Sequence, residues 1–205
     1  MNMKQLVQAG YDRVSQAYRS DDGASEYNYS AWIAELLSML GSSPRVLDLG
    51  CGCGVPATRL LASHGRVTGV DFSHVQVERA RRLVPDADFI CEDMCAVRFP
   101  PESFDAVVSF YAIFHLPLDE QPTLFRRIAE WLPLGGRFMA TLGTRSWTGT
   151  EDNWLGVPDA RMWWSHAGAT TCRGWLEDAG FSIVREAFIP EGSSGCQLFH
   201  AQRTV

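Results

Sequence analysis

Short apolar runs alternate with longer amphipathic stretches over most of this chain. The runs predict buried strands at 46–49, 66–71, 87–91, 104–109 and 137–142. Apolar residues at helical spacing lie between them and predict helices at 29–40, 57–61, 74–83 and 124–132. Residues 1–43 as a whole are predicted to be mostly helical. This order of strands and helices is typical of an α/β fold with a mostly parallel sheet.

The last third of the chain interrupts the pattern once. Residues 143–170 follow no regular period and contain four tryptophans, so we interpret them as an irregular insertion that brings aromatic walls over the sheet edge. A hydrophobic plug without ligand contact is the alternative. A helix is then predicted to end at Gly180, followed by a strand to about Phe188 and a last strand at 196–203. No repeat or linker divides residues 1–205, which predicts a single domain.

Composition limits the kinds of partner. The 205 residues have a formal charge of −6, which argues against a large phosphate-binding surface, so no nucleic-acid partner is expected. No charged leader precedes an apolar core and no apolar run reaches membrane-spanning length, which predicts a cytoplasmic protein without a membrane partner. The six cysteines lack paired C-x-x-C spacing, so we expect neither a metal site nor disulfides. A monomer or a homodimer is expected.

The segment after the first predicted strand has glycine at every second position. Its glycines have no Cβ, so the backbone can approach a ligand closely. The helix that follows presents free N–H groups and its positive end to the same point. We therefore predict a cofactor-binding turn, although a packing turn without ligand is the alternative. Its expected contacts are Asp48, Gly50, Cys51, Gly52 and Gly54.

This stretch resembles motif I of the class I S-adenosylmethionine (SAM)-dependent methyltransferases, in particular the type 11/25-like enzymes that act on small molecules. In that family the acid and the glycines surround the methionine part of SAM. The dinucleotide fingerprint G-x-G-x-x-G has a different spacing, which disfavours a nicotinamide cofactor. The resemblance covers nearly the whole chain. It implies a Rossmann-like, doubly wound sheet of seven strands, mostly parallel with an antiparallel last strand and helices on both faces, and it implies S-adenosylhomocysteine (SAH) as product.

Two acids follow the second and third predicted strands. Asp71 lies 21 residues after Gly50, close to the spacing at which an acid meets ribose hydroxyls in nucleotide-binding α/β units. Capping of the next helix is its alternative role. Phe72 would then flank the adenine. The resemblance implies that Asp93 accepts the adenine amino group and that the backbone N–H of Met94 reaches a ring nitrogen, with an acidic solvent loop as the alternative.

Further cofactor contacts are predicted from two other segments. Tyr11 and Tyr18 are seven residues apart and can face one side of a helix. The segment around them resembles the Y-D-x-x-A-x-x-Y lead-in of small methyltransferases, which implies that this side closes over SAM; packing against the sheet is the alternative. Ser109 ends the fourth predicted strand and Phe110 follows it, at the edge where ligands bind in open α/β sheets, and both are expected to contact SAM.

The methyl acceptor is predicted to be a small, partly aromatic or apolar metabolite, because the chain is acidic, has no nucleic-acid module and is rich in tryptophan near the sheet edge. The expected acceptor-binding residues are Tyr111, His115, Trp147, Trp163, Trp164 and His166. His166 is the first candidate base and His115 the second, because imidazole titrates near neutral pH. A non-methylating SAM enzyme, a nicotinamide oxidoreductase and a non-catalytic SAM-binding subunit remain open alternatives.

Overall fold

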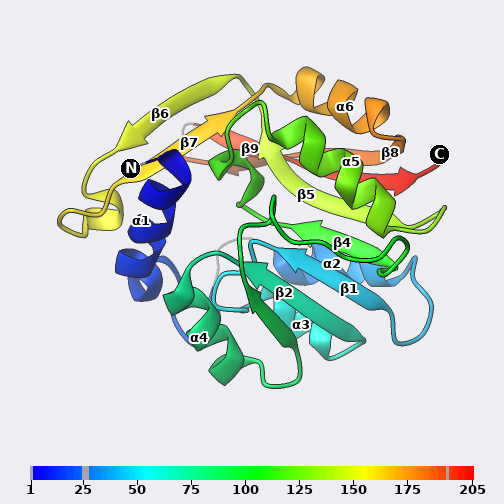
Figure 1. Cartoon of the computed structure of the whole chain (residues 1–205), viewed down its shortest axis with the longest axis horizontal. Coiled ribbons are helices and arrows are strands. Elements are labelled where there is room, and N and C mark those ends of the chain that lie inside the picture. The colour runs from blue at the N-terminus through cyan, green and yellow to red at the C-terminus, as the bar shows by residue number, and fades with distance from the viewer. Residues whose placement is uncertain (1, 25–27, 193) are drawn as a thin grey trace.

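The computed structural model describes residues 2–24, 28–192 and 194–205, and a seven-stranded sheet forms its centre (Figure 1). In spatial order the strands are β3 (Asp88–Cys91), β2 (Arg66–Asp71), β1 (Arg45–Leu49), β4 (Ala106–Ser109), β5 (Arg137–Gly143), β9 (Ser194–Arg203) and β8 (Phe181–Glu191). β9 pairs antiparallel with both β5 and β8, and the other strand pairs of this sheet are parallel. The predicted Rossmann-like sheet, mostly parallel with an antiparallel last strand, is therefore confirmed.

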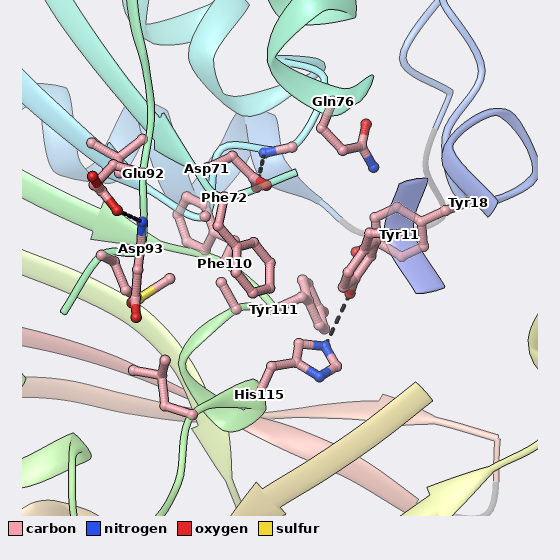
Figure 2. A pocket seen from close by; sticks show the side chains of 16 residues that line it. Tyr11, Tyr18, Asp71, Phe72, Gln76, Glu92, Asp93, Phe110, Tyr111 and His115 are labelled. Carbon is pink, nitrogen blue, oxygen red and sulfur yellow. Dashed lines mark hydrogen bonds between the residues drawn. The ribbon is translucent and has the colours of Figure 1, made fainter. Parts of the chain in front are cut away.

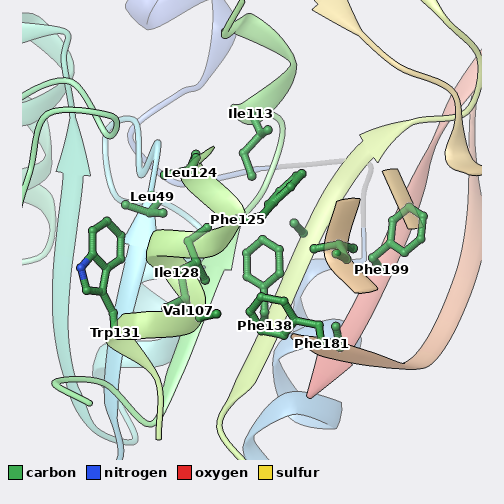
Figure 3. Close-up of a cluster of buried hydrophobic side chains, with 14 of the residues drawn as sticks. Leu49, Val107, Ile113, Leu124, Phe125, Ile128, Trp131, Phe138, Phe181 and Phe199 are labelled. Carbon is green, nitrogen blue, oxygen red and sulfur yellow. The ribbon is translucent and has the colours of Figure 1, made fainter. Parts of the chain in front are cut away.

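Helices cover both faces of the sheet because residues of each strand alternate between two apolar layers. The helices are α1 (Met3–Tyr18), α2 (Tyr29–Leu37), α3 (Ala57–Ala62), α4 (His74–Leu83), α5 (Gln121–Trp131) and α6 (Ala169–Asp178), with short 3-10 turns η1 (Ile113–His115) and η2 (Trp154–Gly156). On one face α2 and α3 pack against Val46 and Met139. On the other, α5 and α6 pack against Leu49 and Phe138 (Figure 3).

The order of the central strands determines where a ligand can bind. Strands β2 and β3 lie on one side of β1. After β3 the chain crosses to the other side, where β4 pairs with β1, so the loops that follow β1 and β4 separate from each other. Such a switch point opens a crevice at the carboxyl ends of the strands. The loops after β1, β2, β3 and β4 all converge at this edge, which positions residues from four distant segments together.

The predicted irregular insertion is in part regular, so that prediction was wrong. It contains an antiparallel hairpin of β6 (Trp147–Glu151) and β7 (Met162–His166), joined through η2. Four of the five β6 residues are exposed, so this strand has no buried side and no apolar alternation in its sequence. Its β-branched Thr148 and Thr150 are the one local indication of a strand.

Helix α1 lies between this hairpin and α4 (Figure 1). Leu6 and Val7 pack against Met162 and Trp163 of β7. A capping box at Asn2 and Gln5 satisfies the first free N–H groups of the helix. The N-terminal helix is therefore fixed across the carboxyl edge of the sheet. None of the helices in the described ranges is long and apolar enough to span a membrane.

Candidate active site

The turn after β1 is a tight glycine turn held by backbone hydrogen bonds. The N–H of Gly50 donates to the carbonyl of Val70 at 2.7 Å. Gly50 has a φ of +74° and Gly52 a φ of +55°, a conformation that side chains rarely adopt. A Cβ on Gly50 would lie 2.1 Å from the Cβ of Ala112, whereas no protein atom lies within 4 Å of the corresponding point on Gly52. The turn thus leaves open space beside Gly52.

Gly50 and Gly52 line the inner cavity, which Figure 2 shows from close by. Its walls come from α1, the glycine turn, and the segments that follow β2, β3 and β4. The lining residues are Tyr11, Tyr18, Gly50, Gly52, Val70, Asp71, Phe72, Gln76, Glu92, Asp93, Met94, Phe110, Tyr111, Ala112, His115 and Leu116. Eleven of these residues were singled out from the sequence; Val70, Gln76, Glu92, Ala112 and Leu116 were not.

Asp71 is the central acid of the inner cavity. Its two carboxylate oxygens accept the N–H groups of Gly52 and Ser73, each at 2.9 Å (Figure 2 draws the first). Burial raises the pKa of Asp71 to about 6, although both hydrogen bonds act in the opposite direction. A hydroxyl donor placed beside this carboxylate would favour its charged form. The carboxylate is thus connected to the glycine turn and still has lone pairs for a ligand.

Asp93 and Met94 follow β3 at the far end of the inner cavity. One oxygen of Asp93 accepts the N–H of Cys95 at 2.8 Å, and the other accepts Lys4 Nζ at 2.7 Å. Lys4 also contacts Glu120, so the first turn of α1 is attached to both acids. A carboxylate offers about four lone-pair positions, so Asp93 retains acceptor capacity for a ligand amino group.

A side cavity lies on the other side of the glycine turn. It shares Tyr18, Gly50, Gly52 and Phe110 with the inner cavity, and the rest of its lining is Arg19, Tyr29, Asp48, Cys51, Cys53, Val55, Pro56 and Ala57. The Arg19 guanidinium lies 5.4 Å from the ring centre of Tyr18 and 5.8 Å from that of Tyr29. The lining of the side cavity thus includes both a cation, Arg19, and an acid, Asp48.

Two residues predicted as cofactor contacts line neither cavity. The buried Ser109 hydroxyl donates to the carbonyl of Leu49 at 2.8 Å, so it ties β4 to β1. A Cβ on Gly54 would meet Val84 at 3.0 Å, so this glycine faces the core under α4. Both residues are thus placed in contact with protein.

Asp48 is buried, and its Oδ2 accepts the hydroxyl of Thr58 at 2.6 Å. Burial raises the pKa of Asp48 to about 7. In the unfolded chain this carboxyl ionises near pH 4, so its ionisation opposes folding increasingly as the pH rises from about 4 to 7. Asp48→Asn is therefore expected to be more stable than the wild type at pH 8, by roughly 4 kcal/mol, and equally stable near pH 4.

Urea unfolding at the two pH values measures this difference. The exposed Asp88→Asn substitution on β3 serves as the control and should change little at either pH. An Asp48→Asn variant less stable than the wild type at pH 8 would contradict the account.

An aromatic cavity of about 450 Å³ adjoins the inner cavity. The two share Tyr11, Tyr18, Tyr111 and His115, and the aromatic cavity is completed by Arg19, Ala24, Phe114, Trp154, Leu155, Trp164 and Glu191. The ring centres of Trp154 and Trp164 are 5.7 Å apart, and those of Tyr11 and Trp154 are 5.4 Å apart. Flat apolar groups would find stacking partners here. Trp154 and Leu155 come from η2, so the insertion does reach this space.

Tyr11 and His115 form a hydrogen-bonded pair between these two cavities. His115 Nδ1 lies 2.7 Å from the carbonyl oxygen of Trp163 and must donate to it, so the neutral ring has its lone pair on Nε2. That atom lies 3.0 Å from the hydroxyl of Tyr11, which donates to it (Figure 2). Burial lowers the pKa of His115 to about 4. The imidazole is therefore neutral at physiological pH and able to accept a proton.

The other candidate base, His166, lies in a separate outer cavity with Trp147 and Arg145. Its Nδ1 donates to the carbonyl of Arg145 at 2.7 Å. The Phe114 ring lies beside both histidines, 5.0 Å from His115 and 6.4 Å from His166 between ring centres. The structure thus places His115, and not His166, at the wall that the inner and aromatic cavities share.

The predicted tryptophans are divided among different surroundings. Trp164 lines both the aromatic and the outer cavity, whereas Trp147 lines only the outer one and is 46% exposed. The buried Trp163 packs against α1 and contributes its backbone carbonyl to His115. Across residues 2–24, 28–192 and 194–205, no group of three or more His, Cys, Asp or Glu side chains is placed to hold a metal ion.

The sequence is similar to those of known methyltransferases. Residues 46–136 match a family model described as a methyltransferase domain. The 27-O-demethylrifamycin SV methyltransferase of Amycolatopsis mediterranei is 30% identical over 142 residues, which cover 64% of this chain and 52% of that protein. The chain thus spans about half the length of this relative.

Two solved structures show that the fold is shared over the full length. Magnesium protoporphyrin IX methyltransferase from Synechocystis PCC 6803, solved with bound SAM, superimposes with a TM-score of 0.74 at 18% identity and covers 100% of this chain and 98% of its own. The [4+2]-cyclase SpnF superimposes with a TM-score of 0.73 at 21% identity, with the same coverage of 100% and 98%.

Proposed function

We propose, since the chain belongs to the class I SAM-dependent methyltransferases, that it transfers a methyl group from SAM to a small, flat acceptor and releases SAH. The observation that supports this most is the pair of adjoining cavities. One has a carboxylate-bearing glycine turn suited to a nucleoside, the other has aromatic walls, and the Tyr11–His115 pair lies between them. We also propose a cytoplasmic monomer or homodimer that requires neither nucleic acid nor membrane.

The residues of the inner and side cavities suit SAM in charge and in hydrogen-bonding groups. Asp71 would accept the ribose hydroxyls, and Asp93 with the Met94 N–H would bind the adenine edge between Phe72 and Phe110. The open space beside Gly52 leaves room for the sugar. In the side cavity, Arg19 would bind the carboxylate of the methionine part and Asp48 would favour its ammonium group. Bound SAM supplies a sulfonium methyl that is already electrophilic.

The protein then has two tasks: to orient the acceptor and to remove its proton. Aromatic walls hold a flat acceptor in line with the cofactor and exclude water, and such positioning can account for about 7–11 kcal/mol in favourable models. We propose that an O–H or N–H proton of the acceptor passes to the Tyr11 oxygen while the Tyr11 proton passes to His115 Nε2. Charge and protons balance, since the imidazole becomes imidazolium and the acceptor becomes the nucleophile.

Two similar proteins support a small-molecule acceptor. They are the methyltransferases of 27-O-demethylrifamycin SV and of magnesium protoporphyrin IX. The [4+2]-cyclase supports the alternative that the chain catalyses a non-methylating reaction on the same fold.

Two measurements test the proposal. Calorimetry should show that SAM and SAH bind and that NADH does not. A screen of metabolite extracts with methyl-labelled SAM should then yield SAH together with a product heavier by one methylene. SAM binding with a changed substrate but without SAH formation would favour the non-methylating alternative, and preferential NADH binding would refute both.

Turnover of the acceptor so identified is expected to depend on the Tyr11 hydroxyl. Tyr11→Phe retains the ring but removes the proton route, so turnover should fall about 100-fold or more. In the wild type, turnover should also fall as the pH drops through about 4, because protonated His115 cannot accept a proton. His166→Ala is the comparison and should leave turnover close to that of the wild type. Unchanged turnover in Tyr11→Phe would refute the proton route.

A further inference from the structure

Glu191 is the last residue of β8 and lies where two cavities meet. It lines both the aromatic cavity and the outer cavity, together with Phe114 and Trp164. The mechanism above gives it no role, and no motif in the sequence singled it out. Glu191 lines the aromatic cavity but not the inner cavity. It is therefore a candidate to contact the end of an acceptor that points away from the cofactor.

The Glu191 carboxylate is incompletely paired. Its Oε2 accepts the thiol of Cys196 at 3.6 Å, a weak hydrogen bond. Its Oε1 is buried and has no hydrogen-bond partner among the described residues. A buried carboxylate oxygen without a donor is costly, so such an atom in a cavity wall indicates a ligand that brings the donor.

The nearby cations of the protein are engaged elsewhere. Arg19 donates to the carbonyl of Ala24 at 2.9 Å and lies over the rings of Tyr18 and Tyr29. Arg145 reaches the hydroxyl of Ser194 at 3.5 Å. Neither guanidinium forms an ion pair with Glu191 within the described ranges. A positive group beside Glu191 would therefore come from a ligand.

The walls next to Glu191 favour the same kind of group. Trp154 and Trp164 meet nearly at right angles, with an interplanar angle of 80°. Such a corner offers one ring face for stacking with a flat ligand and a second for attraction to a cation. Glu191 and the two indoles thus combine a negative charge with aromatic surfaces in one space.

We propose that this corner is a subsite for an ammonium group, and that the acceptor is an aromatic amine whose charged end is bound by Glu191. The flat ring would stack on Trp154 or Trp164, and the atom to be methylated would lie toward Tyr11 and the cofactor. Glu191 then determines specificity and takes no part in methyl transfer. This inference rests on the proposed function, because it describes the acceptor of the same site.

A matched pair of probes tests the charge preference. Tyramine and 3-(4-hydroxyphenyl)propionate share a phenol ring and differ in the charge at the end of the side chain. Calorimetry on the full chain, with and without SAH, is expected to show that tyramine binds at least about tenfold more tightly than 3-(4-hydroxyphenyl)propionate. The reason is that only the ammonium group of tyramine can donate a charge-assisted hydrogen bond to Glu191. In Glu191→Gln this preference should disappear while SAH affinity stays unchanged.

The control is Glu151→Gln, which removes an exposed acid of the outer cavity that does not line the aromatic cavity. It should retain the preference for tyramine. Equal binding of the two probes, no detectable binding of tyramine, or an undiminished preference in Glu191→Gln would each overturn the ammonium subsite. Failure of SAH to bind the wild type would instead contradict the proposed function, and the titrations without SAH still test the subsite in that case.

Discussion

Replacing Asp71 by asparagine is expected to weaken SAH binding by about 100-fold. Both carboxylate oxygens already accept backbone N–H groups, from Gly52 and Ser73. Asparagine turns one of these acceptors into a donor, so the turn loses a hydrogen bond and the ribose loses a charged partner. Hydrogen bonds to charged groups contribute about 1.5–3 kcal/mol, which corresponds to roughly a 10- to 150-fold change in affinity. Calorimetric titration with SAH measures the effect.

The same substitution should also remove a pH dependence. The pKa of Asp71 is raised to about 6, and the ligand needs the charged form. Wild-type affinity is therefore complete above that value and falls as the pH drops below it, whereas Asp71→Asn should show no such decrease. Asp88→Asn, an exposed carboxyl on the neighbouring strand, is the control and should bind SAH like the wild type. Similar affinity of wild type and Asp71→Asn across the pH range would refute the ribose role.

Alanine at Gly50 is expected to cost both stability and binding. The new Cβ would stand 2.1 Å from the Cβ of Ala112, and the positive φ of +74° adds strain. Left-handed backbone costs about 1–2 kcal/mol and overpacking about 1–3 kcal/mol, so the free energy of unfolding should fall by about 3 kcal/mol. Urea unfolding measures this loss, and SAH binding should be abolished because the turn must shift.

Two other glycines separate these effects. Gly52 also has a positive φ but no protein atom near its Cβ position, so Gly52→Ala should lose only about 1–2 kcal/mol of stability while its methyl group occupies ligand space. Gly156 in η2 has a φ of +71° and equally open surroundings, so Gly156→Ala reports strain alone and should bind SAH normally. The turn assignment fails if Gly52→Ala binds SAH as tightly as Gly156→Ala does.

Much of the sheet could be predicted because its central strands are buried on both faces. Such strands are rich in apolar residues, as in β1 and β4. The bounds of β2, Arg66 and Asp71, are also those that its sequence predicts. Residues that directly follow these strands could be assigned to the ligand edge for the same reason. The hairpin was missed because β6 is exposed on both sides and has no buried stripe.

The remaining site residues depend on distant contacts that no local pattern contains. Arg19 directly follows α1, and Gln76 lies in the first turn of α4. Both reach the cavities only through the packing of α1 on α4. The sequence ranked His166 before His115 as a base, but no local pattern shows which imidazole reaches the inner cavity, because imidazole position depends on how β7 and η1 pack together. Had β7 been predicted as a strand, the alternation of its side chains between two faces would have separated Trp163, which faces α1, from Trp164 and His166.

Helix α1 supplies Tyr11 and Tyr18 to both the inner and the aromatic cavity, and Lys4 at its start is bound to Asp93. A movement of this helix large enough to admit the nucleoside therefore also opens the way to the acceptor. Entry and departure of both ligands then depend on one opening event. At saturating concentrations, turnover could then not exceed the rate at which that helix moves away from the sheet.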